Sequence, residues 1–567
     1  MPLKLNGMTP KGGTALEIGK LTVLVGPNNS GKSQTLRDIR DFMVSGSTQR
    51  LTIADNLEVG LPTQTEAMAG LSCLPHTSPG HSRILGVASD LQSRHEFAPP
   101  GPWIEQHFTR VDQANVRDEL LKNMGQYWCA FLDAESRFKL AAPVDSYDTR
   151  SETPSNALQA FFSGGTAVVE ELRTAFKDTF SMDIALDWAA MRKLYLKVGA
   201  NFGVIPDTRS QLDTLLKDAQ QLSQQGDGYK SFAGIALALL AFPNRLLMLD
   251  EPEAFLHPAQ TRALGRWIAG NAKDRAAQVI LASHSADFLL GVISADPDAT
   301  VIRLNRSARG TTFHKIPPAT TAGLINSPLL SSQPVLDALF HKGVVVCEGD
   351  PDRAVYQTVL HKFLRSEGGE EVLLIHSNGK DAAKLPIEML RSSGTPVCAI
   401  VDIDVLNSAA TLGEIITALS GLPADARVTA ARDSVATMVE KARQGDLLAA
   451  LKEAVRRWLD TEYTDLRRAR KALAAGAKVK SKWDVVKRRG VDIFDGADRT
   501  TVDELLLLLD EIGLFIVRCG ELEGWFRLGL EKGAQWNRAA LEKLHTGDCP
   551  DDLKEFVHGV LKFLLPG

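Results

Sequence analysis

Short, continuous apolar runs recur along the chain and alternate with segments of helical periodicity. In the first half, these runs occupy residues 20–25, 127–133, 246–250 and 278–282. Runs of this kind, bounded by polar loop residues, are typical of buried strands. We interpret residues 43–125 as peripheral strands and loops, and residues 154–225 as largely helical. The pattern predicts an α/β domain.

The pattern changes near residues 327–338, and we place a domain boundary there, with one domain over 1–335 and a second over 336–567. In the second domain, apolar runs at 343–347, 371–375, 396–401 and 513–519 alternate with helical segments. This alternation predicts a parallel βα sheet. A helical insert over about 420–495 interrupts it. The length of 567 residues also favours more than one hydrophobic core.

Composition is that of an ordinary soluble protein, with 44% hydrophobic and 23% charged residues. The net charge of −5 argues against a protein that coats DNA uniformly, but it permits a local basic groove. The chain begins without a signal-like segment, and no apolar run reaches membrane-spanning length. We therefore expect a cytoplasmic protein without a membrane partner, in which Cys347, Cys398 and Cys519 are reduced core residues.

A glycine-rich loop, G-P-N-N-S-G-K-S at residues 26–33, follows the first apolar run and opens a helical segment. In such a loop, backbone N–H groups surround phosphate oxygens, the lysine reaches the terminal phosphates and the serine hydroxyl binds Mg²⁺. ATP and Mg²⁺ are the expected cofactors. The candidate binding residues are Gly26, Asn28, Asn29, Ser30, Gly31, Lys32 and Ser33.

A second acidic pair completes this nucleotide site. The run L-L-M-L-D-E ends in Asp250, which is expected to support the Mg²⁺ shell, and Glu251, which is expected to polarise the attacking water. The alternative for Asp250 is a helix N-cap. His284, in S-H-S after the next strand, is placed to sense the γ-phosphate, although a single histidine is often structural.

Carboxylates follow three apolar runs of the second domain. Glu348 and Asp352 follow the run at 343–347, and Asp402 and Asp404 follow the run at 396–401. Carboxyl ends of parallel strands share one edge of a sheet, and clustered carboxylates suit Mg²⁺. Two such ions activate a water and stabilise the leaving oxygen of a phosphodiester. Glu348 is alternatively a general acid or base, and each residue alone is alternatively a helix cap or a solvated loop residue.

The third run, at 513–519, leads into G-E-L-E and adds Glu521 and Glu523 to the same edge. This pair favours a two-metal site. Lys380, in H-S-N-G-K-D after the second strand, is expected to face the same cleft.

The glycine loop and D-E-P-E-A-F-L-H-P resemble ABC-type ATPases, and the carboxylate pattern resembles the Toprim domain. Their order resembles the OLD (overcoming lysogenization defect) family of nucleases, which includes the Gabija defence nuclease. The resemblance implies an ABC-type P-loop ATPase domain followed by a Toprim domain, and a metal-dependent DNA endonuclease active against phage. Mn²⁺ and Ca²⁺ are alternative ions at the Toprim site. A basic residue after the third strand completes the family's site, and Lys532 and Lys543 are both candidates.

The resemblance also implies a head-to-tail homodimer or higher homo-oligomer, with a dimerisation insert at about 150–225. In G-D-G-Y-K-S at 226–231, Gly228 and Ser231 are expected to contact phosphate from a second protomer. Gln106 and Gln126 are candidates for the family's Q-loop glutamine. Arg137 lies either near the nucleotide or in a structural salt bridge. A helicase-like or other defence protein is a further expected partner.

The insert carries a run of basic residues that contains one acidic residue, Asp484. We expect this surface to contact DNA; a solvated helix face is the alternative. Trp458 and Trp483 are candidates for base stacking or for the core. The basic residues are Arg467, Arg468, Arg470, Lys471, Lys478, Lys480, Lys482, Lys487, Arg488 and Arg489.

Two other functions compete with a nuclease. One is a non-cleaving, ATP-dependent DNA-repair clamp with a degenerate Toprim domain. The other is a transporter-type ATPase subunit, which leaves the carboxylate half without a purpose. The sequence leaves open whether ATP activates or inhibits cleavage.

Overall fold

The computed structural model describes residues 3–566 except 276, 308–309, 327–332, 442–451, 453–454, 457, 460–464, 468, 471–472, 474–481, 527, 529 and 531. The chain divides into two compact units, Met1–Phe340 and His341–Gly567. The boundary expected between residues 335 and 336 falls inside helix α13 (Gln333–Asp337), so the division comes after this helix rather than within it.

The first unit is organised around a six-stranded sheet in the order β16-β15-β3-β14-β13-β8. All neighbours pair in parallel except β15 and β16, which form an antiparallel hairpin. The sheet strands are β3 (Leu21–Val25), β8 (Cys129–Leu132), β13 (Leu246–Asp250), β14 (Val279–Ala282), β15 (Thr300–Ser307) and β16 (Gly310–Lys315).

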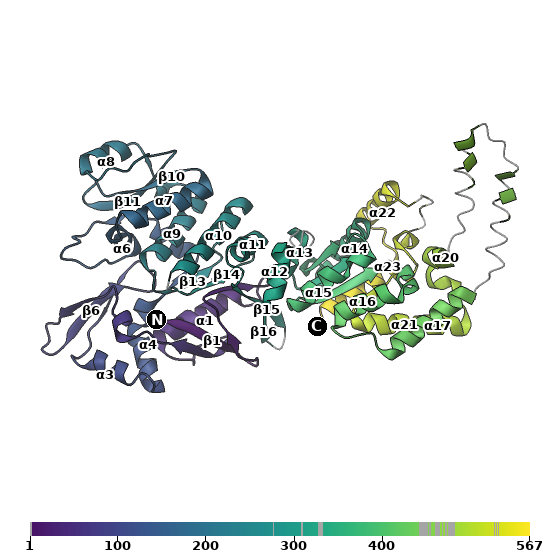
Figure 1. Ribbon diagram of the computed structural model, residues 1–567, viewed down its shortest axis with the longest axis horizontal. Coiled ribbons are helices and arrows are strands. Elements are labelled where there is room, and N and C mark those ends of the chain that lie inside the picture. Colours follow the sequence, from purple (N-terminus) through teal and green to yellow (C-terminus); the bar gives the residue numbers. More distant parts are fainter. Residues whose placement is uncertain are drawn as a thin grey trace. The chain divides into compact units, whose positions relative to one another are not determined.

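Helices cover both faces of this sheet, as Figure 1 shows for α1 on one side and α9, α10 and α11 on the other. Alternate strand residues, such as Leu246 and Met248, pack in one core with α1 and α4. Because side chains alternate between the two faces of a strand, Leu247 and Leu249 face the opposite layer. The helices of this unit are α1 (Lys32–Ser45), α2 (Gln64–Ala67), α3 (Trp103–Thr109), α4 (Ala114–Trp128), α5 (Ala134–Leu140), α6 (Ala157–Ser163), α7 (Thr166–Phe180), α8 (Arg209–Leu216), α9 (Asp227–Ala241), α10 (Pro258–Asp274), α11 (Ala286–Ala295), α12 (Pro318–Asn326) and α13.

Three smaller sheets surround the main one. They contain β1 (Lys4–Pro10), β2 (Leu16–Glu17) and β4 (Ala54–Gly60); β5 (Ser72–Pro75), β6 (Ser82–Val87) and β7 (Arg94–Phe97); and β9 (Val144–Asp145), β10 (Asp183–Asp187), β11 (Lys193–Gly199) and β12 (Gln220–Gln221). The expectation that residues 154–225 are largely helical was therefore wrong for β10 and β11. These short strands pair with each other in a hairpin that lies between α7 and α8 in sequence, and tertiary pairing of this kind leaves little local signal.

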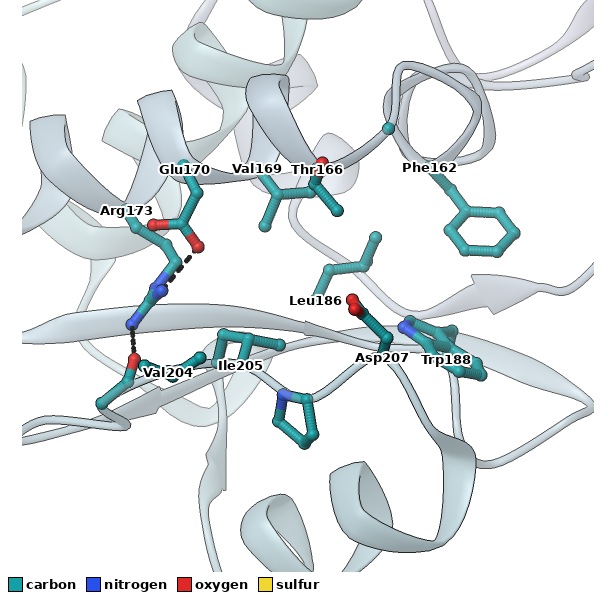
Figure 2. Close-up of a pocket in the computed structure, with 13 residues that line it drawn as sticks. Phe162, Thr166, Val169, Glu170, Arg173, Leu186, Trp188, Val204, Ile205 and Asp207 are labelled. Atoms are coloured by element: carbon teal, nitrogen blue, oxygen red, sulfur yellow. Dashed lines mark hydrogen bonds and ion pairs between the residues drawn. The ribbon is translucent and has the colours of Figure 1, made fainter.

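A pocket of about 600 Å³ lies between α7 and this small sheet. Figure 2 shows Val169, Leu186 and Trp188 along its apolar walls and the segment at 204–207 along its lower edge. Arg173 donates to the carbonyl of Gly203 at 2.8 Å, which fastens this segment to α7.

The second unit contains a four-stranded parallel sheet in the order β18-β17-β19-β20. Its strands are β17 (Gly343–Cys347), β18 (Val372–His376), β19 (Val397–Val401) and β20 (Leu514–Ile516). Val345, Cys347 and Ile400 share a core with α14, α22 and α23, whereas α15 and α16 pack beside β19 and β20. The helices are α14 (Asp350–Phe363), α15 (Lys384–Ser392), α16 (Ala409–Ser420), α17 (Ala426–Lys441), α20 (Lys482–Arg489), α21 (Gly496–Ile512), α22 (Ala534–Thr546) and α23 (Asp551–Leu564).

No helix in the described part of the chain has both the length and the apolar character that crossing a bilayer requires.

Candidate nucleotide and metal sites

The glycine loop joins β3 to α1, as its position after a strand and before a helix predicts. Gly26 has φ 137°, and a Cβ there would lie 2.3 Å from the carbonyl oxygen of Leu304. Gly31 has φ 103° and directly precedes α1. Side chains at either position would strain the turn, so glycine is required for the shape of the loop.

The last two residues of this motif, Lys32 and Ser33, lie close to the acidic residues at the end of β13. The Lys32 ammonium donates to the carbonyls of Gly26 and Pro27 at 2.7 and 2.9 Å. The Ser33 hydroxyl donates to Asp250 Oδ1 at 2.8 Å. Burial lowers the pKa of Lys32 and raises the pKa of Asp250. The structure therefore brings together the hydroxyl and the carboxylate that an ATP-bound Mg²⁺ requires.

The remaining loop residues differ in exposure. Asn28 and Asn29 are exposed, and Asn29 has a left-handed backbone with φ 60°. Ser30 is buried, and its hydroxyl has no hydrogen-bond partner among the described residues.

Glu251 and His284 meet at the ends of neighbouring strands β13 and β14. Nδ1 of His284 lies 3.3 Å from Oε1 of Glu251 and 3.6 Å from Oε1 of Glu253. Glu253 is buried and accepts hydrogen bonds from the Ser283 hydroxyl at 2.8 Å and the His284 N–H at 2.9 Å. The motif D-E-P-E was recognised in the sequence. It did not reveal that its second glutamate, Glu253, fixes the segment that carries His284 after β14.

Ser231 lies inside the subunit, which corrects the expectation of a phosphate contact from a second protomer. Its side chain is fully buried, and its hydroxyl accepts a hydrogen bond from Arg137 Nε at 2.9 Å. Gly228, one turn earlier in α9, is partly exposed, and a Cβ there would lie 2.7 Å from the carbonyl oxygen of Phe255. Ser231, three residues after Gly228 in α9, faces the core.

Within the described part of the chain, neither glutamine considered for the Q-loop hydrogen-bonds to the glycine loop. Gln106 is exposed on α3, and Gln126 on α4 accepts hydrogen bonds from the N–H and hydroxyl of Ser89 at 3.3 and 2.7 Å. Arg137 donates to the backbone carbonyls of Asp250 and Glu251, so its contacts agree with the expected position near the nucleotide site rather than with the alternative of a structural salt bridge.

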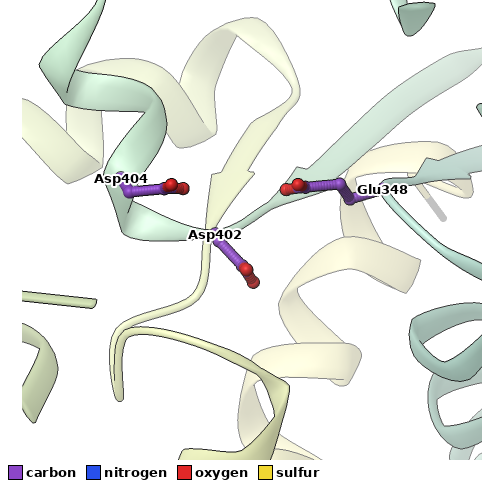
Figure 3. Close-up of side chains that lie close together, drawn as sticks. All are labelled: Glu348, Asp402 and Asp404. Carbon is purple, nitrogen blue, oxygen red and sulfur yellow. The ribbon is translucent and has the colours of Figure 1, made fainter. Parts of the chain in front are cut away.

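Carboxylates from two strand ends form a cluster in the second unit. Glu348 follows β17, and Asp402 and Asp404 follow β19, its parallel neighbour. Ligand oxygens of these three residues all lie within 4.8 Å of one another. Figure 3 shows the side chains of Glu348 and Asp404 pointing toward each other, with Asp402 between the two elements that carry them.

The cluster suits a divalent cation. Glu348 Oε2 and Asp404 Oδ1 are buried, and neither has a hydrogen-bond partner among the described residues. Buried carboxylate oxygens without a donor are costly unless a cation or ordered water satisfies them. The hard oxygen donors, their number and their spacing all fit Mg²⁺ or a similar ion.

We call the carboxylates after β17, β19 and β20 the acidic edge: Glu348, Asp352, Asp402, Asp404, Glu521 and Glu523. Among the described residues, three lysines contact it, and one of them was not expected there. Lys487, in α20, lies 2.8 Å from Asp402 Oδ2 and 3.4 Å from Asp404 Oδ2. Lys380 lies 2.8 Å from Asp404 Oδ2. Lys532 lies 3.1 Å from Glu521 and 3.3 Å from Glu523.

Lys543, the other candidate after the third strand, instead pairs with Asp548 at 2.8 Å near the end of α22. Its ion-pair partner is thus outside the acidic edge. Lys487 was included only in the basic run, because a helix far along the chain gave no local sign that it returns to β19.

Burial changes the protonation of two carboxyl groups at this edge. Burial and the charge of Glu348 raise the pKa of Asp402 to about 7, against the opposing effect of Lys487. Burial and Glu348 likewise raise the pKa of Asp352 to about 6. Asp352 accepts a hydrogen bond from the Gly349 N–H at 3.0 Å, which caps α14. Its role at the start of α14 is therefore at least partly structural.

A pocket of about 350 Å³ opens over this edge. It is lined by residues from six separate segments of the unit, including Glu348, Asp402, Lys487, Glu523 and Lys532. The pocket combines carboxylates for a cation with ammonium groups for an anion, which suits a phosphodiester together with its metal.

The basic run is only partly described. Lys482, Lys487, Arg488 and Arg489 lie on α20, where Arg488 and Arg489 are exposed. Trp483 is 8% exposed and belongs to the core, and the Trp458 indole donates to the carbonyl of Ala469 at 2.9 Å. Arg467 and Arg470 are exposed, whereas Arg468, Lys471, Lys478 and Lys480 lie outside the described residues.

Two family models match the chain. Residues 135–291 match "AAA domain, putative AbiEii toxin, Type IV TA system", and residues 339–404 match "Overcoming lysogenization defect protein-like, TOPRIM domain". The first match includes Asp250, Glu251 and His284, and the second includes Glu348, Asp402 and Asp404.

Two curated relatives match shorter stretches. The chain is 24% identical to the Old nuclease of Escherichia phage P2 over 176 residues, which is 29% of this chain and 28% of the relative. It is 37% identical over 68 residues to the uncharacterized protein MJECL11 of Methanocaldococcus jannaschii, or 12% of this chain and 60% of the relative. The matches thus span less than two thirds of either relative.

Among solved structures, an SMC head bound to the C-terminal winged-helix domain of ScpA aligns with 55% of this chain and 96% of its own, at 14% identity and a TM-score of 0.31. The SMC head domain from Thermotoga maritima aligns with 56% of this chain and 100% of its own, at 14% identity and a TM-score of 0.29.

The parallel sheet around a phosphate loop agrees with the first family match, and the carboxylate-edged sheet agrees with the second. The expected fold class, a P-loop ATPase domain followed by a Toprim domain, is confirmed. The chain therefore has the ATPase–Toprim architecture of the OLD family.

Proposed function

We propose that this chain is an ATP-binding, divalent-metal-dependent DNA endonuclease. The observation that carries the proposal is the cluster of Glu348, Asp402 and Asp404, whose ligand oxygens lie within 4.8 Å of one another. Two buried oxygens of this cluster have no hydrogen-bond partner among the described residues, as expected of carboxylate groups that bind a cation.

Each part of the acidic edge has a role in this proposal. Mg²⁺ or Mn²⁺ held there supplies a Lewis acid and a more acidic water for attack on a phosphodiester, and Ca²⁺ is a further candidate for binding. Glu521 and Glu523 extend the edge toward a second ion. Lys487 and Lys532 place positive charge beside the pocket, where they stabilise the charge that develops on the phosphate oxygens.

Exposed cations continue from this pocket along α20. Arg488 and Arg489 follow Lys487 in the same helix and are exposed. Basic side chains of this kind neutralise backbone phosphates without reading sequence. We therefore assign α20 to DNA contact.

The nucleotide site follows the same logic. Gly26, Gly31 and Lys32 bind the phosphates of ATP, while Ser33 and Asp250 hold its Mg²⁺. Glu251 orients the attacking water, and His284, 3.3 Å from Glu251, senses the γ-phosphate. ATP then controls cleavage, with the ATPase unit forming a homodimer or a higher homo-oligomer.

A role in defence against phage is supported by the relative named Old nuclease and by the overcoming-lysogenization-defect family model. A helicase-like or other defence protein is the corresponding partner, and the cytoplasm is the corresponding compartment.

The test is a plasmid-nicking assay of the full chain with Mg²⁺, Mn²⁺ or Ca²⁺, each with and without ATP. We expect cleavage with at least one ion and its loss in Asp402→Ala. Asp425→Ala is the matched control, because Asp425 is half-exposed and pairs with Arg427 instead of the cluster. The absence of nicking under every condition would favour a DNA-binding clamp with an inactive Toprim domain.

A further inference from the structure

Arg137 is a buried cation that belongs to neither of the two sites as usually defined. It lies on α5, its side chain is fully buried, and burial lowers the pKa of its guanidinium. Two of its hydrogen bonds go to backbone carbonyls at the end of β13, and the third goes to α9. Its Nη1 donates to the Asp250 carbonyl at 2.6 Å, and its Nη2 donates to the Glu251 carbonyl at 3.0 Å.

The carbonyls that Arg137 holds belong to a strained turn. Glu251 has φ 48°, a left-handed conformation that costs a non-glycine residue about 1–3 kcal/mol. The Glu251 N–H donates to the Ala282 carbonyl at 2.8 Å, so the turn is fixed from β14 and from Arg137. This conformation brings the Glu251 carboxylate to 3.3 Å from His284.

The third hydrogen bond of Arg137 leads to α9. Its Nε donates to the Ser231 hydroxyl at 2.9 Å. Gly234, one turn later, allows α9 to approach α5 closely, because a Cβ at this position would lie 2.4 Å from the Arg137 carbonyl oxygen. A shift of α9 along α5 therefore moves the partner of the Arg137 guanidinium.

We propose that Arg137 is a positioning residue that couples the position of α9 against α5 to the orientation of the Glu251 side chain. When α9 is seated, Ser231 holds the guanidinium in the orientation that supports the Glu251 turn. When α9 moves, the turn loses one of its two supports and Glu251 leaves the orientation needed to polarise water. This inference rests on the proposed hydrolysis of ATP by this unit.

The experiment compares Arg137→Lys and Ser231→Ala with the wild-type chain. A lysine keeps the charge but offers no planar set of donors to two carbonyls and a hydroxyl. We expect Arg137→Lys to lower kcat for ATP hydrolysis by about 10- to 100-fold with the Kd for a non-hydrolysable ATP analogue changed less than about threefold. Ser231→Ala, which removes a single acceptor, is expected to lower kcat by about 3- to 10-fold.

Arg245→Lys is the matched control. Arg245 is also buried in this unit and also donates to two backbone carbonyls, those of Ala88 and Val87, at 3.1 and 2.6 Å. We expect its replacement to lower the melting temperature without a selective loss of kcat. Because the two arginines are alike in burial and hydrogen bonding, a loss of kcat that is caused only by lower stability will appear in both Arg137→Lys and Arg245→Lys.

A second readout does not depend on hydrolysis. Hydrogen–deuterium exchange over residues 250–256 is expected to rise in Arg137→Lys and in Ser231→Ala, and to stay at the wild-type level in Arg245→Lys. If the wild-type chain hydrolyses ATP and Arg137→Lys and Ser231→Ala have the same kcat as wild type, the inference is overturned. Unchanged hydrogen–deuterium exchange over residues 250–256 in these two variants also overturns it. If the wild-type chain hydrolyses no ATP, the proposed function fails instead, and the exchange measurement alone decides the coupling.

Discussion

The ammonium of Lys487 lies 2.8 Å from Oδ2 of Asp402. This contact joins a helix of the basic insert to the carboxyl end of β19. The lysine places a positive charge where a bound cation would also be attracted, and it lines the same pocket as Glu348 and Lys532. In the proposed nuclease it has two opposing effects, since it competes with the metal for Asp402 and supplies charge to a phosphate.

Replacing Lys487 by methionine separates these effects. Metal affinity is expected to rise by about fivefold, which corresponds to the loss of about 1 kcal/mol of a partly exposed ion pair. Nicking is expected to fall by at least about tenfold, because the phosphate loses a charge-assisted contact. Mn²⁺ titration calorimetry and plasmid nicking measure the two quantities. Lys543→Met is the control, because Lys543 pairs with Asp548; an equal effect of both variants would contradict the role of Lys487.

Metal affinity is expected to fall as the pH drops below about 7. Burial raises the pKa of Asp402 to about 7 from its ordinary value of 3.8, and a carboxyl group must lose its proton to bind metal. Asp352, whose pKa is about 6, adds a second proton at lower pH. Mn²⁺ titrations at several pH values between about 5.5 and 8 test this. An affinity that is constant over this range would argue against Asp402 as a ligand.

The same shift has a consequence for stability in the absence of metal. Because the folded-state pKa of Asp402 is above the unfolded value, the folded protein binds more protons between pH 3.8 and about 7. The contribution of Asp402 to stability is therefore fully present below about pH 4 and is lost as the pH rises toward 7. Urea unfolding in the presence of a chelator measures it, and Asp402→Asn is expected to remove this part of the pH dependence.

Glu251→Gln is expected to retain ATP binding and to lose hydrolysis by about 10²- to 10⁴-fold, as for removal of a general base. The amide has the same size as the carboxylate and does not alter the glycine loop. Lys32→Met provides the contrast, because it removes the cation of the loop and should weaken binding itself. Equilibrium binding of a fluorescent ATP analogue and phosphate release distinguish the two variants. Hydrolysis at the wild-type rate in Glu251→Gln would assign the base to another residue.

Replacing either of two helical glycines, Gly234 or Gly270, by alanine is expected to change the free energy of unfolding in opposite directions. Gly234→Ala forces a methyl group to within 2.4 Å of the Arg137 carbonyl oxygen and should destabilise the first unit by about 1–3 kcal/mol. Gly270, inside α10, has open space around an added Cβ, so Gly270→Ala should stabilise the unit by up to about 1 kcal/mol. Chemical denaturation monitored by circular dichroism measures both. Equal effects would show that α5 and α9 have room to separate.

Strands β3, β13, β14, β17 and β19 could be predicted from sequence because each is a continuous apolar run next to a chemically distinctive loop, whereas β15 and β16 of the main sheet were not predicted. β17 and β19 end at carboxylates, and β13 ends at Asp250, so the pattern and the chemistry agreed. Strands β10 and β11 were missed because they lie between helical segments and pair only with each other or with two-residue strands. Their stability comes from contacts that no local pattern records.

The candidate sites show the same division. The contact of Ser33 with Asp250 follows from two motifs at the carboxyl ends of β3 and β13, two parallel strands of one sheet with β14 between them. The inward orientation of Ser231 depends on how α9 is rotated against α5, and the approach of Lys487 to Asp402 depends on where an insert returns. Both are tertiary relationships over long separations, and neither follows from the residues nearby.

The acidic edge also has an order of assembly. Glu348 lies near the beginning of the second unit, whereas Glu523 and Lys532 follow β20, the strand at the edge of the sheet beside β19. During translation, the strands that carry Glu348 and Asp402 emerge long before the segment that carries Glu523 and Lys532. A ribosome-bound chain therefore lacks a complete acidic edge until nearly all of this unit has been synthesised.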